Sequence, residues 1–234
     1  MANKRVKLSD HKKTVNDCLK GMLLLWFLTL APVAFAHPIN YALEEAPNGS
    51  VCMYYLKLGY LHILPNGFDH ILFVTGLCLL STKLSTILWQ ATAFTVAHSI
   101  TLALSVKNII VAPGSIVEPL IALSILFIAV ENLFVSRLSS WRIVIVFMFG
   151  LIHGMGFASA LNAIGLPRNK FSLSIFSFNA GVELGQVTVI IIVFALIIIP
   201  LRNIKNYKKR IVYPLSAGIA ATAIYWTVQR CFFV

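Results

Sequence analysis

Histidine, carboxylate and amide side chains recur inside the longest apolar stretches of this chain. An ionisable group within a bilayer costs about 3 kcal/mol on insertion scales, so those that remain usually pair with one another, face a cavity or bind something. The ionisable residues in such positions are Asp69, His70, His98, Glu118, Glu131, His153 and Glu183. These residues are therefore the first candidates for chemistry.

The combination of imidazoles and carboxylates indicates a metal site. Three imidazoles with two or three carboxylates suit nickel, zinc, copper or iron, whereas magnesium and calcium favour sites made of oxygen alone. Thiolate chemistry is not offered, because Cys52, Cys78 and Cys231 show no C-x-x-C spacing. A proton relay built from the same groups is an open alternative, and any single histidine could simply hydrogen-bond a neighbour.

Membrane-spanning helices must position these side chains. The sequence is 59% hydrophobic with a mean hydropathy of +0.85, which is too apolar for the surface of a soluble domain. A bilayer core needs roughly 20 apolar residues per helix, and suitable stretches lie near residues 67–82, 86–106, 115–135, 141–161, 174–200 and 211–229. We predict an all-α, polytopic membrane helix bundle with about six transmembrane helices.

The predicted spans place most of the candidates at a similar depth. Glu131 falls near the inner end of its helix, where a second station or an exit could lie. Asn179, Glu183 and Gln186 share one helical face, as expected for a stripe that points into the bundle. The outer half of the membrane, within a slab of about 10 to 15 Å, holds Asp69, His70, His98, Glu118, His153 and Glu183.

Residues 1–36 have the pattern of a secretory signal peptide. A basic segment precedes the apolar stretch 21–35, and Ala34-Phe35-Ala36 supplies small residues at the positions that signal peptidase recognises. We predict cleavage after Ala36, with an uncleaved anchor as the alternative; either outcome places residue 37 outside. A mature amino terminus at His37 would offer an amine and an imidazole able to chelate copper or nickel, unless that position is an accident of cleavage.

The positive charges favour a topology rather than a nucleic-acid site. The formal net charge is +11, but the Lys and Arg residues lie at the amino terminus and in short connections between apolar stretches. Lys83, Arg142 and the basic segment 202–210 would lie in the cytoplasm. We expect a multi-pass protein of the bacterial inner membrane, with a periplasmic segment and interfacial helix at residues 37–66 and the six-helix transmembrane domain at residues 67–234.

Several short motifs resemble those of the HupE/UreJ family of hydrogenase and urease accessory membrane proteins. They are His62-Ile-Leu-Pro-Asn-Gly-Phe-Asp69-His70, Phe94-Thr-Val-Ala-His98-Ser, Val117-Glu118-Pro119, Glu131-Asn132, Gly150-Leu-Ile-His153-Gly and Phe178-Asn-Ala-Gly-Val-Glu183. The resemblance covers residues 60–190 and implies a nickel permease with metal-handling positions at His62, Asp69, His70 and His153, and metalloenzyme maturation proteins as possible partners. Six residues separate His62 from the Asp69-His70 pair where better-known permeases have five, which indicates a sister branch.

The function expected from the sequence is membrane transport of a divalent transition metal ion, nickel first, with copper, cobalt and zinc as alternatives. No tightly bound cofactor and no enzymatic activity are expected. His37, His62 and Glu118 would capture the ion outside, and Glu131 would lie on its way into the cell after the remaining ligands. The alternatives are an intramembrane metal-dependent hydrolase, with Glu183 or Asp69 as general base, and a non-transporting accessory subunit.

Overall fold

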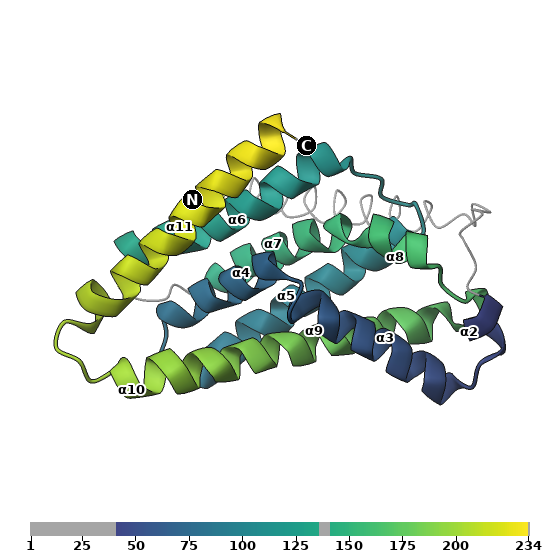
Figure 1. Cartoon of the computed structure of the whole chain (residues 1–234), viewed down its shortest axis with the longest axis horizontal. Helices are drawn as coiled ribbons and strands as arrows, with labels where there is room; N and C mark the ends of the chain where they lie inside the picture. The colour runs from purple at the N-terminus through teal and green to yellow at the C-terminus, as the bar shows by residue number, and fades with distance from the viewer. Residues whose placement is uncertain (1–40, 136–140, 234) are drawn as a thin grey trace, which may run out of the picture. The chain divides into compact units, whose positions relative to one another are not determined.

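The computed structural model describes residues 41–135 and 141–233, and the regular elements within these ranges are all helices. The all-α prediction is thereby confirmed, while the predicted signal peptide and His37 lie outside the described residues. Short elements are α2 (Tyr41–Glu45), α8 (Ala158–Ile164), η1 (Arg168–Lys170), η2 (Phe194–Ile198), α10 (Ile199–Leu201) and η3 (Lys208–Val212). The main helices (Figure 1) are α3 (Asn48–Ile63), α4 (Phe68–Leu79), α5 (Leu84–Val106), α6 (Gly114–Phe134), α7 (Arg142–Gly156), α9 (Phe171–Val193) and α11 (Tyr213–Phe232).

Five helical segments of the described chain are long and apolar enough to cross a membrane. They are Leu84–Val106, Gly114–Phe134, Arg142–Ile164, Arg168–Leu201 and Lys208–Phe232. The first of the six predicted spans is shorter than expected, because α4 has 12 residues and a helix of that length extends only about 18 Å. The chain is therefore a multi-pass membrane protein in which α4 does not cross a full bilayer by itself.

Glycines allow α3 and α9 to cross in close contact. A Cβ atom at Gly59 of α3 would overlap the carbonyl oxygen of Phe178, and one at Gly181 of α9 would overlap the carbonyl oxygen of Leu56. Small residues of this kind let helix backbones approach each other where lipid supplies no hydrophobic driving force between helices. The crossing fixes the rotation of α3 and therefore the direction in which its side chains point.

Enlarging Gly59 tests this crossing. We expect Gly59→Val to destabilise the protein by about 3 kcal/mol, because the added carbons would meet backbone rather than a movable side chain. The matched control is Gly49→Ala on the same helix, where an added Cβ meets nothing within 4 Å. Thermal unfolding of both variants in detergent measures the effect, and equal melting temperatures would contradict the close crossing.

A second pair of glycines joins α5 to α7. A Cβ atom at Gly150 would lie 2.9 Å from the Cβ of Ala97, and one at Gly154 would overlap the carbonyl oxygen of His98. His153 lies between these two glycines in sequence. The contact that holds the helices together therefore also sets the position of His153 relative to α5.

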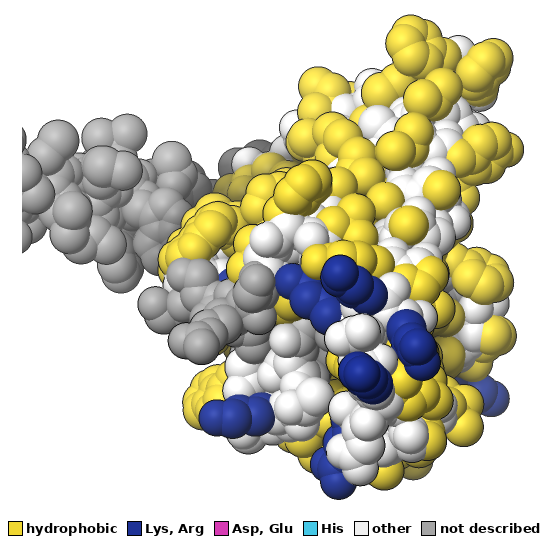
Figure 2. Space-filling view, turned by 90° about the vertical axis from the view of Figure 1, so that its left-hand side faces the viewer, with side chains coloured by type: hydrophobic (Ala, Val, Ile, Leu, Met, Phe, Trp, Pro, Cys, Tyr) yellow, Lys and Arg dark blue, Asp and Glu magenta, His cyan; other side chains and the backbone are white. Residues whose placement is uncertain are grey.

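Basic side chains gather at one end of the bundle. Figure 2 shows Lys and Arg side chains on the face where the connection between α10 and α11 lies. Arg202, Lys205, Lys209 and Arg210 are exposed there, and we call this the basic end. Lys208 Nζ donates a hydrogen bond of 2.6 Å to the carbonyl oxygen of Val135, which ties the connection to the end of α6.

Candidate metal centre

Four histidines from four different helices meet inside the bundle. They are His62 of α3, His70 of α4, His98 of α5 and His153 of α7. The ring centroid of His70 lies 4.8 Å from that of His62, 6.0 Å from that of His98 and 5.0 Å from that of His153. We call this group the histidine cluster, and His70 is its centre.

Three members of the cluster are close enough to share one ion. One ligand nitrogen from each of His62, His70 and His98 lies within 4.8 Å of the other two. Nitrogen ligands bind zinc-like ions at about 2.0 to 2.1 Å, so small side-chain rotations would bring these three onto a common ion. His153 stands beside His70 and is placed to act as a fourth ligand or as the next position along a path.

Each ring of the cluster has a buried nitrogen without a hydrogen-bond partner. Buried polar atoms are paired in the great majority of cases, so an unpaired one needs a reason. Four unpaired nitrogens in one cluster are accounted for together if they serve as ligands. The atoms are His62 Nε2, His70 Nδ1, His98 Nε2 and His153 Nδ1.

Phenylalanine rings enclose the cluster. The Phe94 ring stacks on His98 at an interplanar angle of 21° and lies 4.9 Å from the centroid of His153. The Phe157 ring lies 4.0 Å from the centroid of His62. An apolar shell of this kind excludes water and strengthens the interaction of an ion with its ligands.

The neighbours of His153 determine which of its nitrogens carries the proton. Ser124 Oγ lies 2.7 Å from the carbonyl oxygen of Ile121 and 2.9 Å from His153 Nε2. A hydroxyl has one hydrogen and a carbonyl can only accept, so Ser124 donates to Ile121 and accepts from Nε2–H. In the neutral imidazole this leaves Nδ1 with a free lone pair, and Nδ1 is the nitrogen without a partner.

Asn179 fixes the proton of His98 in the same manner. Its Nδ2 donates a hydrogen bond of 2.8 Å to the carbonyl oxygen of Ile175, so the other side-chain atom, Oδ1, is the acceptor. Oδ1 lies 3.1 Å from His98 Nδ1, which therefore carries the hydrogen. The lone pair of His98 is then on Nε2, the unpaired nitrogen. Metal-binding histidines are commonly oriented by such a second hydrogen bond.

Replacing Asn179 tests this assignment. We expect Asn179→Leu to weaken nickel binding by roughly 10- to 100-fold, because His98 loses the acceptor that fixes its proton and its ring. Asn179→Asp keeps an acceptor at that position and should bind nickel at least as well as the unaltered protein. Calorimetric titration of the purified variants measures both; equal losses in the two would contradict the assignment.

Ser124→Ala makes the same test at His153. We expect a loss of nickel affinity of similar size, because the imidazole can then carry its proton on either nitrogen. Ser216→Ala on α11 is the matched control, since Ser216 is also fully buried and its hydroxyl has no partner. An unchanged affinity in Ser124→Ala would contradict the role of Ser124.

The structure does not bring Asp69 or Glu118 into the cluster. Both Asp69 carboxylate oxygens accept hydrogen bonds of 3.0 Å from Arg230 Nη2. The backbone carbonyl of Glu118 accepts a bond of 3.2 Å from Arg230 Nη1. Asp69, predicted as a metal ligand from its place in an apolar stretch and from the family resemblance, is thus engaged with a cation from α11.

Glu131 is also paired with a cation. It lies near the carboxyl-terminal end of α6, and its Oε2 is 3.4 Å from Arg142 Nε of α7. Both side chains are buried, with 7% and 1% of their surface exposed. Glu131 was predicted as a second station or an exit for the metal ion. The structure places it in a buried ion pair with Arg142 and not in the histidine cluster.

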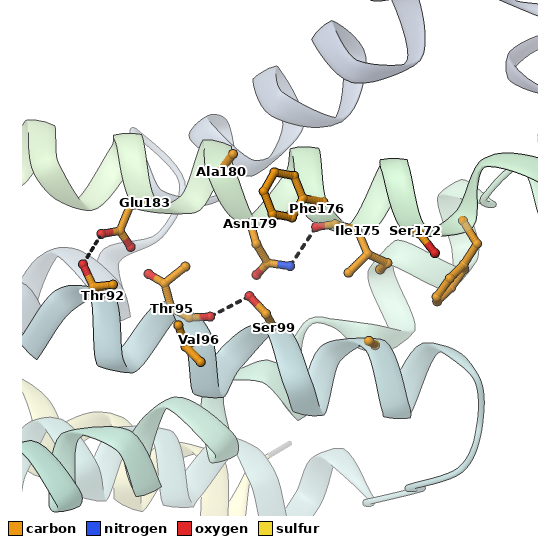
Figure 3. A pocket seen from close by; sticks show the side chains of 12 residues that line it. Thr92, Thr95, Val96, Ser99, Ser172, Ile175, Phe176, Asn179, Ala180 and Glu183 are labelled. Atoms are coloured by element: carbon orange, nitrogen blue, oxygen red, sulfur yellow. Dashed lines mark hydrogen bonds between the residues drawn. The ribbon is translucent and has the colours of Figure 1, made fainter. Parts of the chain in front are cut away.

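Glu183 lines a separate groove between α5 and α9, with a volume of about 580 Å³. Figure 3 shows Glu183 and Asn179 of α9 pointing towards α5, with Thr92 of α5 opposite Glu183, and Thr92 donates a hydrogen bond of 2.7 Å to Glu183. Asn179 lines the groove and also contacts His98, so it links the groove to the cluster. Glu183 itself is outside the group of close metal-binding side chains found in the described chain.

Sequence patterns marked the histidines but not their partners. Arg142 was assigned to a cytoplasmic connection and Arg230 was not singled out, because arginines near the ends of membrane helices commonly reach out to the interface. Ser124 gave no signal, because a serine in a membrane helix usually bonds its own backbone. Asn179 was recognised only as part of a polar stripe, and its partner could not be inferred.

The comparisons with known proteins agree with the motifs. A family model described as HupE / UreJ protein matches residues 40–230. No curated protein and no solved structure matches the chain. The matched range contains the whole histidine cluster together with Ser124, Asn179 and Arg230, and it confirms the resemblance found in residues 60–190.

Proposed function

The chain belongs to the HupE/UreJ family, and from that premise we propose that it carries a divalent transition metal ion across the membrane through the histidine cluster. One observation carries the proposal: four imidazoles converge, each with a buried nitrogen that has no hydrogen-bond partner. Two of the four have their proton held on the opposite nitrogen by Ser124 and Asn179. Rings held in this way present their lone pairs to a cation, and packing alone would not account for the unpaired nitrogens.

Nickel is the first choice of ion. Imidazole ligands suit nickel, copper, cobalt and zinc, whereas magnesium and calcium require oxygen. The close ligand set in the described chain consists of histidines, and it would bind an ion without neutralising its charge. Such a site favours transient occupancy over permanent storage, which is what a transporter needs.

The proposed orientation places the basic end in the cytoplasm. Exposed cations at that end, including Lys205 and Lys209, agree with the positive-inside rule. A signal peptide at residues 1–36, cleaved or retained, would leave His37 in the periplasm of a bacterial inner-membrane protein. The ion would enter from the side of Asp69 and Glu118, occupy the cluster and leave past Glu131, driven by the membrane potential at about 2.3 kcal/mol per charge per 100 mV.

Uptake by liposomes tests the proposal directly. The full chain is reconstituted with an internal metal-sensitive dye, and nickel, cobalt, copper and zinc are added outside in turn. We expect saturable entry of nickel that is absent from protein-free liposomes and from liposomes holding His153→Ala. No entry of any ion would contradict transport.

A hydrolase is the second candidate, because three close histidines are also the ligand set of catalytic zinc sites, which keep a fourth position for water. The groove beside Glu183 would then admit a lipid or peptide from the membrane. This alternative requires one metal ion that stays bound through purification in a fixed ratio to protein. Metal analysis of the protein after dialysis against a chelator distinguishes it from an exchangeable cargo.

A further inference from the structure

Arg230 reaches from the end of α11 to the start of α4. Its Nη2 donates to both oxygens of Asp69 at 3.0 Å, and its Nη1 donates to the carbonyl oxygen of Glu118. The guanidinium also lies over the Trp226 ring, 5.4 Å from the centroid. With 18% and 28% of their side-chain surface exposed, Arg230 and Asp69 are largely shielded from water.

The pair lies next to the histidine cluster. Asp69 immediately precedes His70, the central imidazole, in the first turn of α4. A carboxylate in that position would attract a divalent cation in the cluster, and the attraction would be large because the surroundings are apolar. Arg230 cancels the charge, so an ion in the cluster meets a neutral pair.

We propose that Arg230 holds the metal affinity of the cluster down by neutralising Asp69, so that an ion taken up can also be released. This inference rests on the proposed metal site. A transport site has to bind strongly enough to select its ion and weakly enough to let it go. Neutral imidazoles supply selection, and Arg230 keeps the adjacent anion from trapping the ion.

Arg230→Gln is the decisive variant, because glutamine can still donate a hydrogen bond but carries no charge. We expect nickel to bind on the order of tenfold more tightly, since an uncompensated Asp69 adds attraction, and to dissociate more slowly. Arg168→Gln removes an exposed cation elsewhere and should leave binding unchanged. A role of Arg230 in holding α11 alone predicts the opposite sign, a weaker affinity with a lower melting temperature.

Substitutions of Asp69 show whether the effect passes through this carboxylate. Asp69→Asn leaves Arg230 uncompensated and should weaken binding, whereas Arg230→Gln with Asp69→Asn should restore an affinity within a few-fold of the original protein. If Asp69 were itself a ligand, the double variant would bind as weakly as Asp69→Asn. The double variant also keeps the test decisive if Arg230→Gln alone does not fold, because a neutral pair leaves no partly buried charge without its partner.

The measurement is a nickel titration of each full-length variant in detergent, with the dissociation rate followed after addition of a chelator. Tighter binding in Arg230→Gln and recovery in the double variant support the proposal. An unchanged or weaker affinity in folded Arg230→Gln, or a double variant as weak as Asp69→Asn, overturns it. Absence of saturable binding in the unaltered protein overturns the proposed metal site instead.

Discussion

His70→Ala should lower the nickel affinity of the cluster by about 100-fold or more. The loss should exceed that caused by replacing a residue that only hydrogen-bonds to a ligand. His70 is the imidazole that lies close to all three others. Its removal opens a gap at the centre of the set and leaves the remaining rings without a shared neighbour. Nickel titration of the purified variant measures the loss, and liposome uptake should fall to the level without protein.

The stability of His70→Ala distinguishes loss of a ligand from loss of the fold. His70 Nδ1 is buried without a partner, so the substitution removes no hydrogen bond at that atom, and the metal-free protein should lose only the packing of the ring. Nickel should raise the melting temperature of the unaltered protein, because a ligand that binds only the folded state stabilises it, and should not raise that of His70→Ala. Thr75→Ala on the same helix is the control and should retain the nickel-dependent shift; a shift retained in His70→Ala would contradict the site.

Breaking the pair of Glu131 and Arg142 should have the largest effect on stability. Arg142→Met leaves the Glu131 carboxylate buried without a cation, and removal of one partner of a buried ion pair costs about 3 to 5 kcal/mol. Glu131→Gln should act similarly, since Arg142 is almost completely buried. Thermal unfolding in detergent measures the change, with Arg210→Met, an exposed cation near the same end, as the control.

The double variant separates structure from transport. Glu131→Gln with Arg142→Met replaces the pair with neutral side chains and should recover most of the stability, as neutral replacements of buried pairs often do. If nickel uptake returns together with stability, the role of the pair is to hold α6 and α7 together. If a stable double variant fails to transport, Glu131 is part of the route. A double variant as unstable as either single one would contradict coupling between the two residues.

The sequence alone determined the class of structure and the candidate chemistry. The length and hydropathy of the apolar stretches predicted membrane helices, because in lipid the backbone must satisfy its own hydrogen bonds within a helix. The cost of burying ionisable groups singled out the histidines and carboxylates, and the spacing of motifs such as Phe94-Thr-Val-Ala-His98 indicated the family.

The tertiary structure decided which of these residues meet. Lipid is as apolar as the outer faces of the helices, so the apolar pattern does not fix their rotation, and contacts at small residues do. The crossing at Gly59 and Gly181 turns α3 so that His62 joins the cluster. The same packing brings Arg230 to Asp69 from 161 residues away. Partners this distant in sequence follow from helix rotation and pairing, which no local pattern of residues encodes.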